Sequence, residues 1–184
     1  MIATMPAYLL MLLWIAAAAD VRGRRVPNWL TLGGAVVGVI LQMAYAGIGG
    51  LTTAAAGFLV GALILMPGFL LRATGPADVK LLAAAGTVLG PYHVLIAGFS
   101  SILVGAVIAI GIATATLAMR AARSPWHRYA VMLRTLSVTG RPVYIPPAAD
   151  EVMATRFPFA VAIALGATLT AAWAGLLGGI GVQP

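Results

Sequence analysis

The sequence contains no cysteine and very little charge. Only 8% of its 184 residues are Asp, Glu, Lys or Arg, and 62% are apolar, whereas soluble domains carry about 25% charged residues. The absence of cysteine excludes disulfides, a thiolate nucleophile and a zinc site built from thiolates. The shortage of charge excludes a soluble enzyme, a secreted scaffold and a disordered tail, because a soluble fold cannot bury so much apolar side chain. The class that remains is an all-α, polytopic membrane protein.

Acidic residues are scarcer than basic ones. The sequence has eleven Lys and Arg residues and four carboxylates, which gives a net charge of +7. In a membrane chain this excess is typical of basic cytoplasmic loops, so we expect the lipid bilayer and no nucleic acid as a partner. With so few carboxylates, each can be considered individually: Asp20, Asp78, Asp150 and Glu151.

Apolar runs separated by polar breaks predict six transmembrane helices in a single domain of residues 1–184. No basic residue precedes the first run, so we expect a retained helix rather than a cleaved signal peptide. The fourth run is short, since about 11 residues of helix rise only ~17 Å against ~30 Å of hydrocarbon. The predicted spans are residues 2–19, 29–46, 51–71, 79–89, 94–119 and 157–180.

The distribution of basic residues predicts the orientation. Ten lie in the connections between spans 1 and 2, 3 and 4, and 5 and 6, and Lys80 lies at the edge of the fourth span beside the connection between 3 and 4. The positive-inside rule places these connections in the cytoplasm and both termini outside it. The largest is the cytoplasmic loop 120–156. Within it, Ser124 and Pro125 are typical of a helix start, which leaves two alternatives for 125–138. One is an irregular loop, and the other is an interfacial amphipathic helix whose apolar face carries Trp126, Tyr129, Leu133 and Leu136.

Glycines recur at a spacing of four residues in three of the predicted spans. In lipid this spacing lets helix backbones approach closely. We interpret the pairs as packing sites within the bundle and infer no dimer from them: Gly34 with Gly38, Gly57 with Gly61, and Gly175 with Gly179.

Two aspartates lie at the edges of apolar runs on the same predicted side of the membrane. Asp20 directly follows the first run, and Asp78 directly precedes the fourth. A carboxylate at membrane depth is costly and usually faces the bundle interior or water, where it marks a functional site. The alternative for each is an interfacial carboxylate paired with a neighbouring arginine, such as Arg22 or Arg24 for Asp20.

Two carboxylates that converge can share a proton. One then takes a proton from water while the other donates to a scissile carbonyl. The position of the apolar runs does not establish whether the carboxylates of Asp20 and Asp78 lie close together. Lys80 follows Asp78 by two residues, where it either acts on the charge of that carboxylate or anchors the helix end at lipid phosphates.

The other candidates for chemistry are weaker. His93 falls in a predicted outer turn and His127 on the predicted interfacial helix, and neither has a ligand partner nearby in the sequence. We therefore expect no metal and no cofactor. Asp150 and Glu151 are adjacent in the long loop, where neighbouring side chains point apart, so we interpret them as solvated surface.

Three segments resemble the type IV prepilin peptidases, a family of intramembrane aspartic peptidases of the GxGD type. The stretch from Asp20 to Thr31 reads DVRGRRVPNWLT and resembles the first aspartate motif of that family. The stretch from Gly75 to Leu81 reads GPADVKL and resembles the second, Gly-x-Gly-Asp-x-Lys-Leu. The stretch 156–166, RFPFAVAIALG, resembles the opening of the last helix. The matches occur in order and cover nearly the whole chain.

The resemblance implies a plasma-membrane hydrolase that removes the leader of prepilins at the cytoplasmic face. It assigns Asp20 and Asp78 as the catalytic pair, with no metal and no cofactor. The chain lacks the cysteines and the long first loop of the bifunctional members, which also act as methyltransferases. It therefore resembles the compact, peptidase-only branch of tight-adherence (Flp-type) pilus assembly. The other residues that the motifs place at the site are Pro27, Asn28, Gly75, Ala77, Lys80 and Pro158.

Two positions depart from the family pattern. Ala77 and Ala160 stand where the motifs have glycine, and both keep the site small, so we expect activity to survive. The departure at Ala77 supports the first alternative, a non-catalytic assembly factor of a pilus or secretion system. A second alternative is a small proton-coupled transporter using both aspartates, although these lie on one side and no repeated halves are visible.

Overall fold

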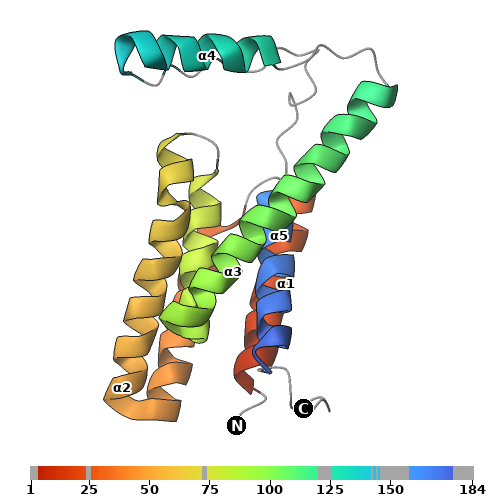
Figure 1. Ribbon diagram of the computed structural model, residues 1–184. Helices are drawn as coiled ribbons and strands as arrows, with labels where there is room; N and C mark the ends of the chain where they lie inside the picture. The colour runs from red at the N-terminus through yellow and green to blue at the C-terminus, as the bar shows by residue number, and fades with distance from the viewer. Residues whose placement is uncertain are drawn as a thin grey trace. The chain divides into compact units, whose positions relative to one another are not determined.

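The computed structural model describes residues 4–23, 26–71, 74–119, 126–141, 143, 145 and 158–175. In this part of the chain it contains only helices, which confirms the predicted all-α class. The chain divides into two compact units, one of residues Met1–Gly105 with Pro158–Pro184, called the bundle here, and one of residues Ala106–Phe157. The helices are α1 (Thr4–Gly23), α2 (Asn28–Leu70), α3 (Pro76–Met119), α4 (Trp126–Thr139) and α5 (Phe159–Trp173) (Figure 1).

Helix α2 folds back on itself at one glycine. Ala46 and Gly47 leave helical geometry, and Gly47 takes a φ of +58°, which a glycine adopts without steric cost. Gly38 and Gly57 lie on opposite sides of this break, and both contact residues 86–88 of α3. In a straight helix they would be ~28 Å apart. The arms 28–45 and 48–70 are therefore antiparallel, as Figure 1 shows.

Helix α3 reverses in the same way at Gly90, which has a φ of +73° and is followed by Pro91. A Cβ on Gly98, beyond the break, would lie 3.3 Å from a methyl carbon of Leu82, before it. A straight helix would separate these residues by ~24 Å. Within the bundle, the arms 76–89 and 91–105 thus also double back. Their first arm is the most enclosed element of the bundle, since every residue from Leu81 to Gly90 is buried.

The helix boundaries refine the predicted spans. Helix α1 continues through Asp20 to Gly23, so this aspartate lies within the last turn rather than after it. The breaks are shorter than predicted, because the second arm of α2 already includes Gly49 and that of α3 starts at Pro91. Of the predicted span 157–180, the structure describes residues 158–175. Helix α5 ends at Trp173, because Gly175 adopts the left-handed conformation with a φ of +66° that terminates helices.

Small residues let the helices of the bundle approach closely. Gly57 and Gly86 face each other so tightly that a Cβ on either would overlap the carbonyl oxygen of the other. A Cβ on Gly61 would lie 2.6 Å from Leu82 O, and one on Gly34 would lie 2.7 Å from a Leu12 methyl carbon. The predicted packing role is confirmed for the pairs in α2. It was wrong for Gly175, which is exposed, while Gly179 lies outside the described residues.

The break at Gly90 exposes carbonyl groups that need partners in an apolar surrounding. Pro91 has no N–H to donate, and the chain leaves helical geometry one residue earlier. Gln42 Nε2 donates to Val88 O at 2.9 Å, and His93 Nδ1 lies 3.3 Å from Leu89 O. Unsatisfied carbonyls cost several kcal/mol in hydrocarbon, so these side chains stabilise the turn. Gln42 thereby joins the first arm of α2 to the end of the first arm of α3.

The segment predicted as an interfacial helix or an irregular loop is helical. Helix α4 covers Trp126–Thr139, which confirms the helical alternative. The rest of loop 120–156, apart from residues 140, 141, 143 and 145, lies outside the described residues, as do Asp150 and Glu151. Arg128 donates to Ile145 O at 2.8 Å and so attaches the following segment to the helix.

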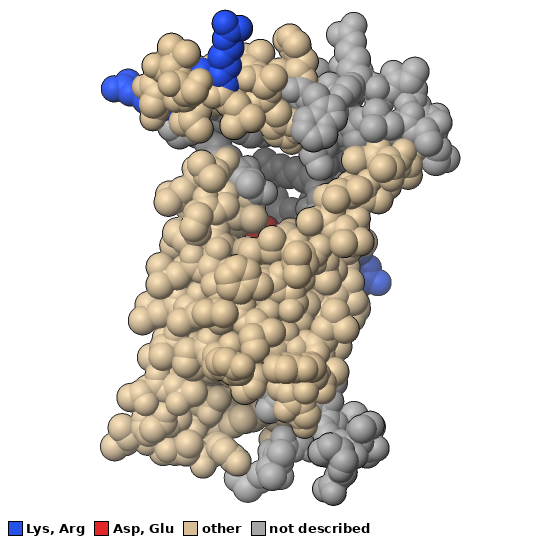
Figure 2. Space-filling model, viewed as in Figure 1, with Lys and Arg blue, Asp and Glu red and all other residues tan. Residues whose placement is uncertain are grey.

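In the described part of the chain, three helices are long and apolar enough to cross a membrane: α1, α2 and the part of α3 up to Ala115. Helix α5 is equally apolar but has only 15 residues. Large apolar side chains are exposed along the outer faces of the long helices, among them Leu32, Leu63 and Leu103. On the face drawn in Figure 2, the described surface of the bundle is almost entirely uncharged. This surface suits contact with lipid.

Candidate active site

Asp20 lies in the last turn of α1, half-buried against the start of α5. The backbone N–H of Ala160 donates to Asp20 Oδ2 at 3.4 Å. Helix α5 begins at Phe159, directly after Pro158, and the first N–H groups of a helix have no partner within it. One of these unpaired donors thus meets the carboxylate. Arg22, one of its alternative partners, is exposed, and Arg24 lies outside the described residues.

Asp78 lies in the first turn of α3 and is only 8% exposed. Its Oδ2 accepts a hydrogen bond of 2.9 Å from the N–H of Gly75, and its own N–H donates to Gly75 O at 3.2 Å. This reciprocal pair of contacts is a form of the capping box, in which an acidic side chain returns to the residue before the helix. A carboxylate in the first turn also interacts favourably with the helix dipole. Local helix chemistry therefore fixes the position of Asp78.

Gly75 is held in turn by the residue before it. Thr74 N–H donates to Gly68 O at 3.2 Å, and Thr74 Oγ1 lies 3.4 Å from Leu65 O. These contacts hold the connection between α2 and α3 against the last turns of α2. The position of Asp78 is thus linked through Gly75 and Thr74 to the second arm of α2.

The two aspartates lie in the same part of the bundle. They are near enough for the charge of Asp20 to act on Asp78. One comes from the C-terminal end of α1 and the other from the N-terminal end of α3, which are separated by more than fifty residues of sequence. This proximity of two carboxylates from distant parts of the sequence is the central feature of this site.

A hydrogen bond joins the starts of α2 and α3. Lys80 Nζ donates to Asn28 Oδ1 at 3.1 Å, and both side chains are exposed. Asn28 is the first residue of α2, after Pro27, and its carbonyl accepts a hydrogen bond of 3.1 Å from Thr31 Oγ1. Sequence reasoning placed Lys80 and Asn28 at the site but missed this contact. It also missed the Ala160 N–H, although Pro158 indicated where a helix with free donors begins.

Ala77 occupies a helical position in the first turn of α3, partly buried against the core. No positive φ is required at this position, because α3 leaves helical φ and ψ angles at Gly90 and not in its first turn. Alanine is also a better helix former than glycine. The departure from the family motif therefore does not disturb the local backbone that carries Asp78.

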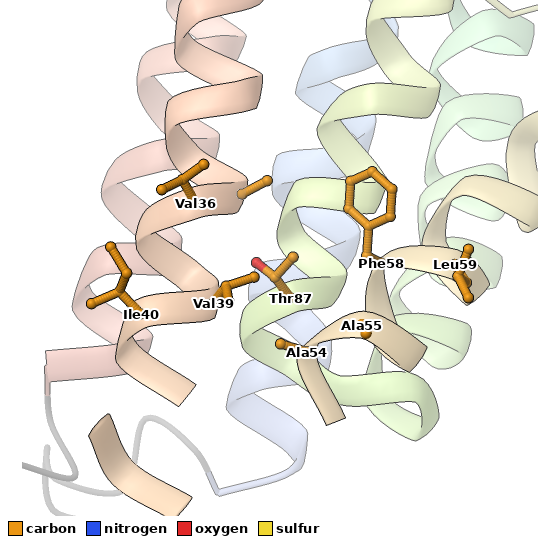
Figure 3. A pocket seen from close by; sticks show the side chains of 9 residues that line it. Val36, Val39, Ile40, Ala54, Ala55, Phe58, Leu59 and Thr87 are labelled. Atoms are coloured by element: carbon orange, nitrogen blue, oxygen red, sulfur yellow. The ribbon is translucent and has the colours of Figure 1, made fainter. Parts of the chain in front are cut away.

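A second concave feature lies away from the aspartates. An open apolar groove of about 470 Å³ separates the two arms of α2 (Figure 3). Val36 and Ile40 line one side, Phe58 and Leu59 line the other, and Thr87 of α3 contributes the polar atom that Figure 3 shows. None of the sequence-predicted site residues lines this groove. In the described residues, no group of three or more His, Cys, Asp or Glu is placed to hold a metal.

Two adjacent carboxylates at helix ends are suited to activating water for hydrolysis of a peptide bond. The sequence profile of the type IV leader peptidase family matches residues 7–110, more than half of the chain, and includes both aspartates. The chain belongs to the type IV leader peptidase family. No curated protein and no solved structure matches it. Its membership in this family of proteases and its apolar helices identify the chain as an integral protein of the inner membrane.

Adding a methyl group at Gly75 is expected to lower leader peptidase activity about tenfold or more, because it displaces Asp78. A Cβ there would lie 3.1 Å from Asp78 Oδ2, the oxygen that Gly75 N–H holds. Small misplacements of reacting groups reduce rates by up to about 10²-fold. Cleavage rates of Gly75→Ala and of Gly23→Ala, whose added methyl group meets nothing within 4 Å, test this. Equal rates for the two variants would contradict it.

Proposed function

We propose that the chain is a prepilin leader peptidase in which Asp20 and Asp78 form the catalytic pair. The observation that supports the proposal is the proximity of two carboxylates from different helices, each of which accepts a hydrogen bond from a backbone N–H. Family membership supports the class of substrate. The remaining site residues act as supports: Gly75 orients Asp78, while Asn28 and Lys80 link the starts of α2 and α3.

In the proposed reaction the pair holds one proton between its two carboxylates. The ionised member takes a proton from water, and the protonated member donates to the oxygen of the scissile carbonyl. The water oxygen bonds to the carbonyl carbon and gives a neutral diol. The carbon–nitrogen bond then breaks as one carboxyl group protonates the leaving nitrogen and the other recovers a proton from the diol. The pair returns to its starting protonation.

The position of the pair suits a substrate that lies partly in the membrane. Both aspartates occupy terminal turns of apolar helices, where water has easier access than at the membrane centre. A prepilin presents a leader outside the hydrocarbon and an apolar helix within it. We propose that this leader is cleaved at the cytoplasmic face.

We further assign the chain to the peptidase-only, Flp-type branch. The sequence lacks cysteine, and only a short connection separates Asp20 from Asn28. A cysteine-based zinc site and an inserted methyltransferase domain therefore have no place in that connection. The expected substrate is an Flp-like prepilin.

The test is cleavage by the purified full chain reconstituted in nanodiscs. An Flp-type prepilin is incubated with the enzyme, and intact mass determines which bond breaks. We expect release of the leader and no methylation of the new N-terminus when a methyl donor is added. An intact prepilin after prolonged incubation with folded enzyme would overturn the proposal.

We propose six membrane crossings. Helix α2 has 43 residues and α3 has 44, so each would measure ~65 Å if straight, more than twice the hydrocarbon thickness of ~30 Å. Because both double back, each supplies two arms that can cross. With α1 and α5 this makes six, and both termini then lie on the side opposite the aspartates.

Single cysteines test this topology without background, because the chain has none. We expect a cysteine at Gly49, in the turn of α2, to react with a membrane-impermeant reagent from outside the cytoplasm. A cysteine at Arg123 should react only after the membrane is opened. The reverse pattern would show that the orientation, and with it the face that carries the aspartates, is inverted.

A further inference from the structure

Helix α4 has an apolar stripe between two arginines. Tyr129, Leu133 and Leu136 share one face at helical spacing and are 37%, 65% and 43% exposed. Arg128 and Arg134 lie on the two flanks of that face. Exposed leucines are costly in water, and this arrangement of an apolar stripe between cationic flanks is typical of helices that lie in a membrane interface.

The charge of the surrounding segment indicates which surface the stripe meets. Residues 120–156 contain six arginines and only two carboxylates. Arg128 is engaged by Ile145 O, whereas Arg134 and Arg141 are exposed. Anionic phospholipid headgroups attract such clusters by about 1 kcal/mol per arginine, or about fivefold each in binding.

The chain itself keeps α4 close to a bilayer. Helix α3 ends at Met119 and α4 begins at Trp126, and this connection can extend at most ~25 Å. The start of α4 is thus confined near the end of a membrane helix. This tether raises its effective concentration at the membrane surface.

We propose that α4 docks on the anionic phospholipid surface of the bilayer, with Tyr129, Leu133 and Leu136 inserted and Arg134 and Arg141 at the headgroups. Docking would hold loop 120–156 at the membrane. The proposal does not rest on the catalytic role of the aspartates.

Nitroxide labels at single cysteines test the docking in the full-length protein. Leu133→Cys reports the apolar stripe, and Val131→Cys is the matched control, because two residues on a helix point to nearly opposite sides. Both side chains are exposed. In liposomes containing phosphatidylglycerol, we expect the label at 133 to be more accessible to oxygen than to a water-soluble nickel complex. The label at 131 should be more accessible to the nickel complex. In phosphatidylcholine liposomes, the label at 133 should shift towards the nickel complex.

The double substitution Arg134→Gln/Arg141→Gln should lower the docking equilibrium about 30-fold in phosphatidylglycerol. Three results would overturn the proposal. Equal accessibility at 131 and 133 would show no docking. Docking that is independent of phosphatidylglycerol would exclude anionic headgroups. Shielding at 133 from both reagents, in detergent as in liposomes, would show that the stripe packs against protein. The comparison of lipids decides the matter even if the double variant fails to fold.

Discussion

Replacing Asp20 or Asp78 with asparagine is expected to lower leader cleavage by at least about 10³-fold, the size of effect for losing an acid–base group and its charge. Each change removes the shared proton and the ability to activate water. The fold should persist, because an asparagine side-chain oxygen can still accept the N–H of Gly75 at position 78, or of Ala160 at position 20. Initial rates at saturating prepilin, with circular dichroism to confirm folding, measure the effect.

The matched controls are the other two carboxylates of the chain. Asp150→Asn and Glu151→Gln remove the same charge from the long loop and should keep activity within about tenfold, since surface carboxylates rarely enter chemistry. Full cleavage by either Asp20→Asn or Asp78→Asn would refute the two-aspartate mechanism. A comparable loss in all four variants would point to general electrostatics instead.

A single methyl group at Gly57 or Gly86 is expected to destabilise the bundle by about 3 kcal/mol or more, at the upper end of overpacking effects. In both cases the added Cβ meets a backbone carbonyl across the helix interface. Rotation of a side chain cannot relieve that overlap, so α2 and the first arm of α3 must separate. The loss is measured as the thermal unfolding midpoint of Gly57→Ala and Gly86→Ala in one detergent.

Gly33→Ala is the control for this effect. Gly33 also lies in α2, but an added Cβ there meets nothing within 4 Å. Because alanine favours helix over glycine by up to about 1 kcal/mol, this variant should be as stable as the parent or slightly more so. Unfolding midpoints that are the same for Gly33→Ala and Gly57→Ala would show that the interface is looser than described.

The sequence predicted the helices well because apolar runs and glycines are local signals. The break at Gly47 and the start of α4 after Pro125 follow from single-residue chemistry. The end of α5 at Trp173 could not be located from the sequence, because the apolar run continues past Gly175 and composition alone does not reveal a left-handed residue.

The two aspartates could be predicted from their position at the edges of apolar runs, but their surroundings could not. The contact of Ala160 with Asp20 joins residues 140 positions apart, and that of Lys80 with Asn28 joins residues 52 apart. Such contacts depend on how helices pack, which no local pattern encodes. The hydrogen bond from Gly75 N–H to the Asp78 carboxylate is the exception, since a carboxylate three residues after a helix cap is a local motif.

The turn of α2 at Gly47 offers a way to image a small membrane protein. At 18.8 kDa, the chain gives little signal for aligning particles in electron cryomicroscopy. Residues 43–49 are all exposed, and Gly47 lies ~28 Å along the first arm from Asn28, the first residue of α2. A rigid helical fusion inserted between Ala46 and Ile48 would continue both antiparallel arms. It would enlarge the particle at the end opposite Asp20 and Asp78 and leave the surroundings of both aspartates unchanged.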